Sequence, residues 1–274
     1  MSSNETSVAT WIAHASRQLT TAHIDTARLD AEMLLSHTLH QPRTWLHAHR
    51  DAALTPSQII VADARLQLRT EHVPVAYIIG HKEFYGRLFR VTPATLVPRP
   101  ESETIIELLN QLITPHRKTT LIDVGTGSGC LGITAKLEHP NLEVTLSDIN
   151  EPALKTARHN AKELKADVTC VQSDLLIDIA GRFGVIIANL PYVDPSWEVS
   201  RSISHEPTLA LFAEDGGLAL IKKLLMQATT HLPAGGYLLL EADPCQHDDI
   251  VTFAKEYGYQ HELIQEYVVV LSRE

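Results

Sequence analysis

The sequence predicts an α/β protein in which a small helical bundle precedes a parallel β-sheet covered by helices on both faces. From residue 119 onward, short apolar runs alternate with helical stretches, as expected for strands joined by crossover helices. Before residue 80, apolar residues recur at helical spacing instead. The length of 274 residues and the hydrophobic fraction of 44% suffice for one large domain or two of ordinary size.

Three helices are predicted in the first 72 residues. In each, apolar residues share one helical face; they are Val8, Trp11, Ile12, Ala15 and Leu19, then Ala27, Ala31, Leu34, Leu35 and Thr38, then Ile59, Ala62 and Leu66. Asp25 is predicted to cap the second helix, and Thr55 followed by Pro56 is predicted to open the third. Seven of the 15 histidines lie before residue 80, but their spacing does not predict a metal site.

The residue composition changes at the end of this bundle. The segment "VPVAYIIGHKEFYGRLFRVTPATLVPRP" holds four prolines and two glycines among short β-like runs, which predicts a linker with a β-hairpin. Two prolines flank Arg99, before a helix predicted from Glu101 to Ile113. The predicted parts of the chain are a helical domain over 1–72, a linker over 73–98 and an α/β domain over 99–274.

The α/β domain is predicted from five apolar runs that read as strands: "TLIDV", "LEVTLSD", "VTCVQ", "FGVIIAN" and "GYLLLE". The helices predicted among them are Leu131–Glu138, Pro152–Leu164 and Leu218–His231. A last β-rich run, "ELIQEYVVVLSR", closes the sequence. Such alternation is typical of a parallel sheet buried on both faces.

Composition limits the compartment and the partners. Three widely spaced cysteines (Cys130, Cys170 and Cys245) form no metal-ligand pattern and fit a reducing cytosol. No apolar run approaches the roughly 20 residues that span a bilayer, and the N-terminus lacks a signal-peptide pattern. We therefore expect a cytoplasmic protein without a membrane partner. The formal net charge of −10 divides into −1 over residues 1–80 and −9 over the rest, which does not suit nucleic acid.

A glycine-rich loop follows the first predicted strand in "LIDVGTGSGCLG". Gly125, Gly127 and Gly129, with Thr126 and Ser128 between them, leave room for a tight turn and a close ligand. The spacing differs from the G-x-G-x-x-G of dinucleotide-binding proteins. Asp148 ends the second strand, 19 residues after Gly129, where a carboxylate can accept hydrogen bonds from both ribose hydroxyls of an adenosine. A strand-to-helix turn without a ligand is the alternative.

Three further residues favour S-adenosylmethionine as the cofactor. Asp123 precedes the glycines, where an acid can hold the loop or meet a cationic ligand. Asp174 ends the third strand, where it can accept the adenine amine or cap a helix, and Leu175 can cover the ring. S-adenosylmethionine carries an ammonium, a sulfonium and a ribose, and it lacks the pyrophosphate that favours a helix N-terminus.

The fourth strand ends in "IIANLPYVDP". In a methyltransferase sheet this strand lies beside the first, so Asn189 is predicted to face the same crevice as the glycine loop. The Asn189 side-chain oxygen and the Leu190 carbonyl can accept the two N–H groups of a planar amide. Pro191 restricts the turn and Tyr192 can cover the planar group. A turn that merely ends the strand is the alternative.

Ordered motifs along nearly the whole chain also carry a family resemblance. They are "TARLDAEMLL", "VAYIIGHKEFYG", "VTPATLVPRPESE", "DVGTGSGCLGI", "SDIN", "QSDL", "ANLPYV" and "HEPTLALFAEDGGL". In this order they resemble the HemK or PrmC family, the bacterial protein-glutamine methyltransferases that modify class I peptide chain release factors. The family usually reads Asn-Pro-Pro-Tyr, and here Leu190 stands at the second position.

The resemblance implies a helical domain that grips the release factor, followed by a seven-stranded Rossmann-like class I methyltransferase domain. The implied substrate is the glutamine of a Gly-Gly-Gln motif, methylated on its side-chain nitrogen in support of translation termination. The implied cofactor contacts are Asp123, Gly125, Thr126, Gly127, Ser128, Gly129, Asp148, Asp174, Leu175 and Asn189. The implied substrate contacts are Asn189, Leu190, Pro191 and Tyr192. Arg99 and Glu206 lie in matching segments, as site residues or as a structural ion pair.

Three other functions share these features. An amino methyltransferase of nucleic-acid bases uses a similar Asn/Asp-Pro-Pro-Tyr/Phe site, although the acidic charge argues against it. A methyltransferase of a ribosomal-protein glutamine differs only in its substrate. A non-catalytic module that binds a nucleotide or the release factor is the third. We expect a monomeric enzyme that binds class I release factors and no specific nucleic acid.

Overall fold

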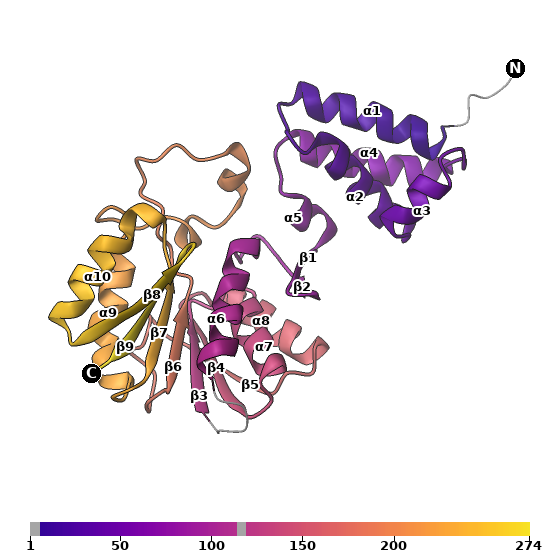
Figure 1. Ribbon diagram of the computed structural model, residues 1–274. Helices are drawn as coiled ribbons and strands as arrows, with labels where there is room; N and C mark the ends of the chain where they lie inside the picture. Colours follow the sequence, from indigo (N-terminus) through magenta and orange to yellow (C-terminus); the bar gives the residue numbers. More distant parts are fainter. Residues whose placement is uncertain (1–5, 114–118) are drawn as a thin grey trace, which may run out of the picture. The chain divides into compact units, whose positions relative to one another are not determined.

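The computed structural model describes residues 6–113 and 119–274. The chain divides into two compact units (Figure 1). Unit 1 comprises the described residues up to Gly80 together with Ser200–His205, and unit 2 comprises those of His81–Val199 and Glu206–Glu274. Among the described residues, every helix is too short or too polar to cross a membrane.

Unit 1 is helical. Its helices are α1 (Val8–Thr21), α2 (Ala27–Leu39), α3 (Arg43–Ala48), α4 (Pro56–Thr70) and α5 (Val75–Ile79), with the 3-10 helix η2 (Arg201–His205). The predicted start of α4 is confirmed, since Thr55 and Gln58 form a reciprocal capping box. The predicted cap of α2 is wrong: Thr26, not Asp25, is its N-cap residue, because the helix starts one residue later than expected.

The core of unit 1 contains most of the predicted helical faces. Trp11, Ala15, Leu19, Leu34 and Leu35 are at most 2% exposed. Two polar contacts tie the helices together: the Trp11 indole donates to Asp63 at 2.8 Å, and the Arg69 Nε donates to the buried Asp30 at 2.8 Å. The buried charge pair is satisfied on both sides, which limits its desolvation cost.

The segment Ser200–His205 belongs to unit 1 through two contacts with the end of α4. The His205 Nε2 lies 2.8 Å from the Glu71 carbonyl, and the Arg69 Nη1 lies 3.5 Å from the Ser202 hydroxyl. Unit 1 is therefore built from two stretches of chain that are far apart in the sequence.

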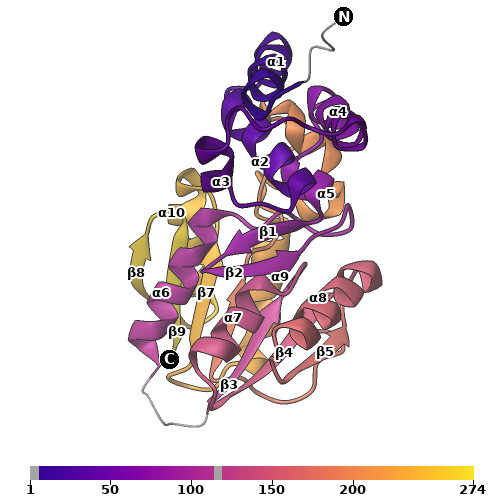
Figure 2. The ribbon, with the colours of Figure 1, turned by 90° about the vertical axis from the view of Figure 1, so that its right-hand side faces the viewer.

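Unit 2 contains the predicted sheet. Its seven strands are β3 (Thr119–Val124), β4 (Leu142–Asp148), β5 (Val168–Gln172), β6 (Val185–Ala188), β7 (Tyr237–Glu241), β8 (Tyr259–Gln265) and β9 (Val268–Arg273). Their order is β5-β4-β3-β6-β7-β9-β8, and only β9 among them runs antiparallel to its neighbours (Figures 1 and 2). The predicted α/β fold is confirmed, with β6 beside β3 as expected for the fourth and first strands.

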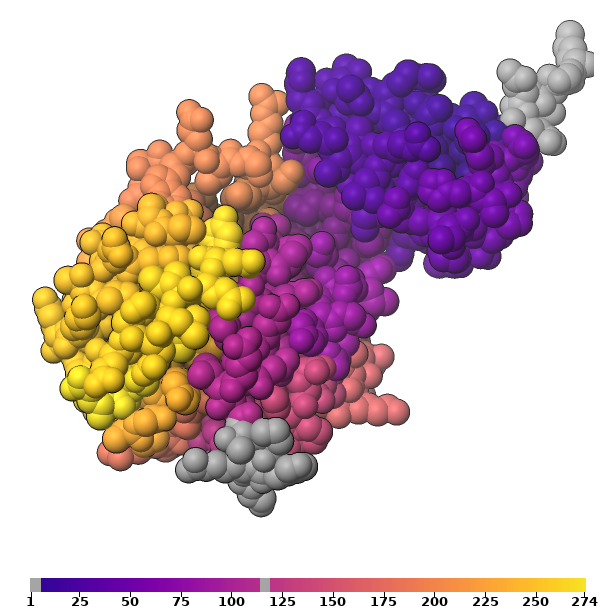
Figure 3. Space-filling model, viewed as in Figure 1, coloured from indigo at the N-terminus to yellow at the C-terminus, as the bar shows by residue number. Residues whose placement is uncertain are grey.

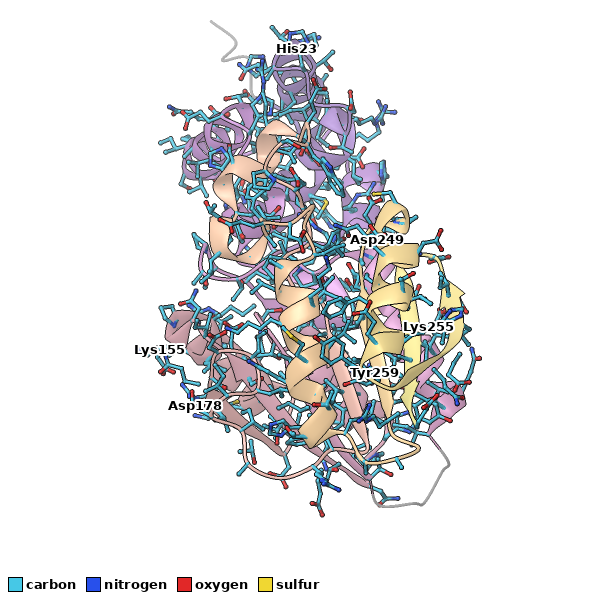
Figure 4. All side chains as sticks on the ribbon, turned by 90° about the vertical axis from the view of Figure 1, so that its left-hand side faces the viewer. His23, Lys155, Asp178, Asp249, Lys255 and Tyr259 are labelled. Atoms are coloured by element: carbon cyan, nitrogen blue, oxygen red, sulfur yellow. The ribbon has the colours of Figure 1, made fainter. Side chains whose placement is uncertain are left out.

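Helices cover both faces of this sheet, and two separate cores result. The helices of unit 2 are α6 (Glu103–Leu112), α7 (Cys130–Glu138), α8 (Glu151–Glu163), α9 (Ala219–His231) and α10 (His247–Glu256). The helices α6, α7 and α8 cover one face, while α9 and α10 cover the other (Figures 1 and 2). Figure 4 looks onto α9 and α10, where the buried Tyr259 donates its hydroxyl to the Leu225 carbonyl of α9 at 2.9 Å.

The hairpin of β1 (His81–Phe84) and β2 (Arg87–Arg90) packs into unit 2. Phe84 and Phe89 are at most 1% exposed and join the core beneath α6 to α8. Helix α6 also contacts the C-terminal strands: Thr104 donates to Glu266, in the turn between β8 and β9, at 2.9 Å. In Figure 3 the magenta surface that includes α6 adjoins the yellow surface of the C-terminal strands.

Candidate active site

The carboxyl ends of β3, β4, β5 and β6 open into one cavity. Because β4 and β6 flank β3, the loops that follow these strands lie side by side. The predicted residues that line the cavity are Gly125, Gly127, Ser128, Asp148, Asp174, Leu175, Asn189, Leu190 and Pro191. The cavity is open to solvent on one side, and its empty space together with that open part is about 1040 Å³. Asp123, Thr126, Gly129 and Tyr192 do not line it.

The glycine loop is held by hydrogen bonds to the neighbouring strand β4. The N–H groups of Gly125 and Thr126 both donate to the Ser147 carbonyl at 2.9 Å, and Gly127 N–H donates to the Asp148 carboxylate at 2.8 Å. Gly127 has a φ of +56°, which explains why a glycine stands at the turn. The loop is therefore shaped before any ligand binds.

Asp123 holds the loop from behind. Its Oδ2 accepts the Thr126 hydroxyl at 2.5 Å and Gly132 N–H at 2.9 Å. Burial raises the pKa of Asp123 to about 6, and its Oδ1 has no hydrogen-bond partner among the described residues. The sequence left open whether Asp123 holds the loop or meets a cationic ligand. Its contacts show that Oδ2 holds the loop, and they assign no role to Oδ1.

Asp148 keeps acceptor capacity for a ligand. Its Oδ1 accepts Asn150 N–H at 2.8 Å and its Oδ2 accepts Gly127 N–H, so each oxygen retains a second lone pair. Burial raises the pKa of this carboxyl, and the backbone N–H groups of Asn150, Gly127 and Ile149 oppose the rise. Asp148 therefore joins the glycine loop to the position where the sequence predicts a ribose.

The end of β5 departs from the expected picture in one respect. Asp174 lines the cavity, but its Oδ2 forms an ion pair with Lys223 of α9 at 2.6 Å. The next residue, Leu175, is buried and has a φ of +55°, an unusual conformation for a bulky side chain. The Lys223 contact was not predictable from the local sequence, because 49 residues separate the two side chains.

The residues after β6 form a turn with three separate supports. The Asn189 Nδ2 donates to the Ser102 hydroxyl at 3.0 Å, at the start of α6. The Tyr192 hydroxyl donates to Glu241 at the end of β7 at 3.3 Å. The Leu190 side chain is 4% exposed and packs beside Gly125, where an added Cβ would lie 2.9 Å from its Cδ2. The glycine loop and the turn formed by Asn189–Tyr192, where the sequence predicts the substrate (the substrate turn), are therefore in direct contact.

Gly217 is required by the same turn. A Cβ there would lie 1.9 Å from the Tyr192 carbonyl oxygen and 2.5 Å from the Gln246 Nε2, which donates to that carbonyl at 2.8 Å. We expect Gly217→Ala to lower the free energy of unfolding by about 1–3 kcal/mol, as measured by urea denaturation, because the turn must move.

Gly216→Ala is the matched control for this change. Gly216 also has a positive φ, of +65°, but an added Cβ meets no atom within 4 Å. Both variants carry the backbone strain of a left-handed residue, and only Gly217→Ala adds crowding. Equal losses of stability in the two variants would contradict the close approach of Gly217 to Tyr192.

Two segments outside the predicted site complete the cavity wall. They are residues 94–99, from the loop before α6, and Pro207–Ala210. Glu206, which is 6% exposed, joins them: it accepts Val97 N–H at 3.1 Å and the Arg99 Nη2 at 2.5 Å. The ion pair of Arg99 and Glu206 therefore joins these two segments of the cavity wall, and Arg99 itself lines the cavity.

Cys130 also lines the cavity, at the first residue of α7. Burial raises the pKa of its thiol to about 12, and the nearby Asp123 carboxyl adds to the rise. A thiol with this pKa stays protonated at neutral pH and is a weak nucleophile. Cys130 therefore acts as a small apolar side chain here.

Comparison with protein families gives two matches that together span most of the chain. Residues 10–80 match the PrmC N-terminal domain, and residues 102–263 match the methyltransferase small domain. The chain is 39% identical to the release factor glutamine methyltransferase of Koribacter versatilis, covering 84% of this chain and 86% of that protein. Relatives of the same name in Coxiella burnetii and Escherichia coli are 35% and 34% identical, covering 89% and 84% of both chains.

Solved structures resemble the chain in fold. A methyltransferase from Pyrococcus furiosus has a TM-score of 0.53 at 20% identity, covering 76% of this chain and 95% of that one. A 16S rRNA methyltransferase from T. thermophilus, solved with AdoMet and guanosine, has a TM-score of 0.52 at 18% identity, covering 71% and 49%. These likenesses support the seven-stranded methyltransferase architecture.

Proposed function

The chain belongs to the family of release factor glutamine methyltransferases, and from that premise we propose that it methylates the glutamine of the Gly-Gly-Gln motif in class I peptide chain release factors. It is an S-adenosylmethionine-dependent glutamine methyltransferase. The release factor and its tripeptide motif are the proposed part. Because bacterial translation takes place in the cytoplasm, this substrate implies a cytoplasmic enzyme.

The observation that carries the proposal is the orientation of Asn189 beside the glycine loop. Its amide nitrogen is bound to Ser102, so its oxygen remains as an acceptor on a residue that lines the cavity. The neighbouring Leu190 packs beside Gly125, which brings the substrate turn next to the cofactor loop. A planar amide in this place meets acceptors for both of its N–H groups, at Asn189 and at the Leu190 carbonyl.

This arrangement fits the chemistry of amide methylation. An amide nitrogen is a poor nucleophile because its lone pair is delocalised into the carbonyl. Acceptors on both N–H groups return electron density to the nitrogen and fix its direction. S-adenosylmethionine, when bound, supplies an electrophilic methyl group on its sulfonium. A new N–C bond forms as the S–C bond breaks, and one N–H proton then leaves to solvent. Alignment of the two reactants supplies much of the acceleration.

The residues present fit S-adenosylmethionine. Asp148 lines the cavity at the end of β4, and its carboxylate retains acceptor capacity beside the glycine loop. Leu175 provides apolar cover in the same cavity. We assign the cofactor to this cavity, with Asp148 on the ribose and Leu175 on the adenine. Asp174 would have to accept a hydrogen bond from the adenine amine while its carboxylate remains paired with Lys223.

Incubation of the enzyme with labelled S-adenosylmethionine and recombinant release factor tests the proposal. We expect one methyl group on the glutamine of the Gly-Gly-Gln peptide, located by mass mapping. Parallel reactions with ribosomal protein and with DNA or RNA test the two alternative substrates. Label on either of these, with none on the release factor, would replace the proposed substrate.

Unit 1 is proposed to recognise the intact release factor without taking part in the chemistry. All of the cavity-lining residues belong to unit 2, and the hairpin that begins at His81 packs into the core of unit 2. A chain starting at His81 keeps Phe84 and Phe89 in that core. We therefore expect it to bind S-adenosylmethionine normally and to methylate the intact release factor at least about tenfold more slowly, which is a cost of about 1.4 kcal/mol.

A short peptide with the Gly-Gly-Gln motif is the control substrate for this truncated chain. Methylation of the peptide should change little, because the peptide makes no use of unit 1. Full activity of the truncated chain on the intact release factor would contradict the proposed role of unit 1. Loss of S-adenosylmethionine binding would instead show that unit 2 depends on unit 1 for its fold.

A further inference from the structure

A cluster of four polar residues lies behind the substrate turn, and the proposed reaction gives a role to only two of them, Asn189 and Tyr192. Its members are Ser102 at the start of α6, Asn189 and Tyr192 after β6, and Glu241 at the end of β7. Ser102 and Glu241 are both 2% exposed. Since Ala188 pairs with Leu240 in the parallel sheet, Asn189 and Glu241 are the next residues of two neighbouring strands. The cluster is thus fixed by the sheet register and by the first turn of α6.

The orientation of Asn189 matters because an amide side chain has two different ends. One end is an acceptor oxygen and the other is an NH₂ with two donors. A substrate amide that presents N–H groups needs the oxygen. A reversed Asn189 would place two donors against two donors and repel the substrate. Free rotation of the side chain would therefore waste a large share of the bound complexes.

The cluster contains acceptors for the nitrogen end of Asn189. The Ser102 hydroxyl accepts the Asn189 Nδ2 at 3.0 Å. Burial raises the pKa of the Glu241 carboxyl, and hydrogen bonding by Ser102, Tyr192 and Asn189 opposes that rise. The Glu241 Oε1 accepts the Tyr192 hydroxyl, while its buried Oε2 lacks a well-aligned partner among the described residues. This leaves an acceptor for the second N–H of Asn189.

We propose that Ser102 and Glu241 are positioning residues that hold the Asn189 amide with its nitrogen toward the interior and its oxygen toward the substrate. The inference rests on the proposed function, because it assumes that the group bound at Asn189 presents N–H donors. Neither residue touches the reacting atoms. They act through Asn189, and Glu241 also acts through the hydroxyl of Tyr192.

The charge of Glu241 makes this positioning dependent on pH. Burial raises the pKa of Glu241 to about 7, and the charge of Glu101 adds to the rise. The other titratable groups that interact with it are Tyr192 and Cys130, whose own pKa values are raised, so both are neutral near pH 7. A protonated Glu241 offers an O–H donor where Asn189 needs an acceptor. We therefore expect kcat to fall as the pH falls through about 7.

Glu241→Gln is the informative variant. It keeps the shape of the side chain but places an NH₂ where Asn189 needs an acceptor. We expect kcat at pH 8 to fall by about 10–100-fold, because a misplaced group costs up to about 10² in rate. KM for S-adenosylmethionine should stay within about twofold, and the dependence of kcat on a group with a pKa near 7 should disappear.

Stability should move in the opposite direction to activity. Because the folded pKa of Glu241 lies above its ordinary value, the charged carboxyl costs stability as the pH rises from that value to about 7. The melting temperature of Glu241→Gln relative to the wild type should therefore be higher at pH 8 than at pH 5. A residue that only supported the fold would lose activity and stability together.

Ser102 is tested by a conservative and a disruptive change. Ser102→Thr keeps the hydroxyl and should retain kcat within about threefold, whereas Ser102→Ala removes it and should lower kcat by about tenfold, the effect of one hydrogen bond of about 1.4 kcal/mol. Thr134→Val is the matched control, since Thr134 is a fully buried hydroxyl of α7 that lines no part of the cavity. It should leave kcat unchanged.

A readout that needs no turnover separates this inference from the proposed function. The two side-chain N–H protons of Asn189, assigned by NMR with Asn189→Asp, should be displaced from the shifts of a solvent-exposed asparagine in the wild type and should return toward those shifts in Glu241→Gln. If the wild type fails to methylate release factors while these signals behave as expected, the proposed substrate is wrong and the positioning stands. Unchanged signals and kcat in both Glu241→Gln and Ser102→Ala would overturn the positioning.

Discussion

Asn189→Ala is expected to lower kcat for methylation of the release factor by about 10²–10³-fold, the usual cost of removing one oriented polar group at a reacting centre. Without the side-chain oxygen, one substrate N–H loses its acceptor, and the nitrogen lone pair is no longer directed at the methyl group. The Ser102 hydroxyl loses a partner as well. The measurement is single-turnover methylation of the release factor with labelled S-adenosylmethionine.

Asn110→Ala is the matched control, since Asn110 lies on the exposed side of α6. Within the described part of the chain, its amide nitrogen donates to the Tyr85 hydroxyl only. It should retain wild-type turnover. Thermal melts of both variants should differ little from the wild type. If Asn189→Ala turned over at a near-normal rate, "NLPY" would be only a turn that ends β6, and the amide acceptor would lie elsewhere.

Asp148→Ala should weaken binding of S-adenosylmethionine by about 10–150-fold, corresponding to the roughly 1.5–3 kcal/mol of hydrogen bonds to a charged group. Two losses contribute. The ribose hydroxyls lose their acceptor, and Gly127 N–H loses the carboxylate that holds the glycine loop. Isothermal titration calorimetry measures the change in Kd directly, without any release factor.

Asp178→Ala is the control for this substitution. Asp178 lies between β5 and β6, is exposed, and does not line the cavity; it is labelled in Figure 4. Its removal changes the net charge by the same amount, so it also accounts for long-range electrostatics. An unchanged Kd in Asp148→Ala would remove Asp148 from the cofactor site and leave the loop-holding role alone.

The sheet was predictable because its strands carry strong local signals. Apolar runs mark β3, β4, β6 and β7, with β-branched residues in the first three, and the glycine loop marks the passage from β3 to α7. The last run, "ELIQEYVVVLSR", gave less information. It splits into the antiparallel strands β8 and β9 at Glu266, which has a φ of +52°. A two-residue turn without glycine or asparagine carries little signal in the sequence.

Helix α10 was not predicted, and its burial explains why. Only His247, Ile250 and Ala254 of its ten residues are buried, so its apolar stripe is short. Its start depends on Asp243, which caps the preceding 3-10 helix η4 (Pro244–Gln246). An acid followed by a proline is compatible with a helix start, but too few apolar residues follow Pro244 for the sequence to predict a helix.

The residues that support the site were harder to find than those that line it. The motifs identified Asn189 and the glycine loop, whereas Glu241 is a single acid at the end of an apolar strand. Its partners Tyr192 and Ser102 lie far away in the sequence, and the register of β6 and β7 together with the start of α6 brings them to it. Glu206 is similar, since 107 residues separate it from Arg99. A lone acid ending a buried strand is the signal that could have marked Glu241.

The left-handed backbone of Leu175 has a consequence for how this protein can be improved. A buried leucine at a φ of +55° costs about 1–3 kcal/mol compared with an ordinary conformation, and glycine or asparagine would relieve that strain. Either replacement would also give up packing in the core of unit 2, at a cost of about 2–5 kcal/mol. A stabilising substitution is therefore not to be sought at Leu175, although its backbone is strained and its side chain lines the cavity.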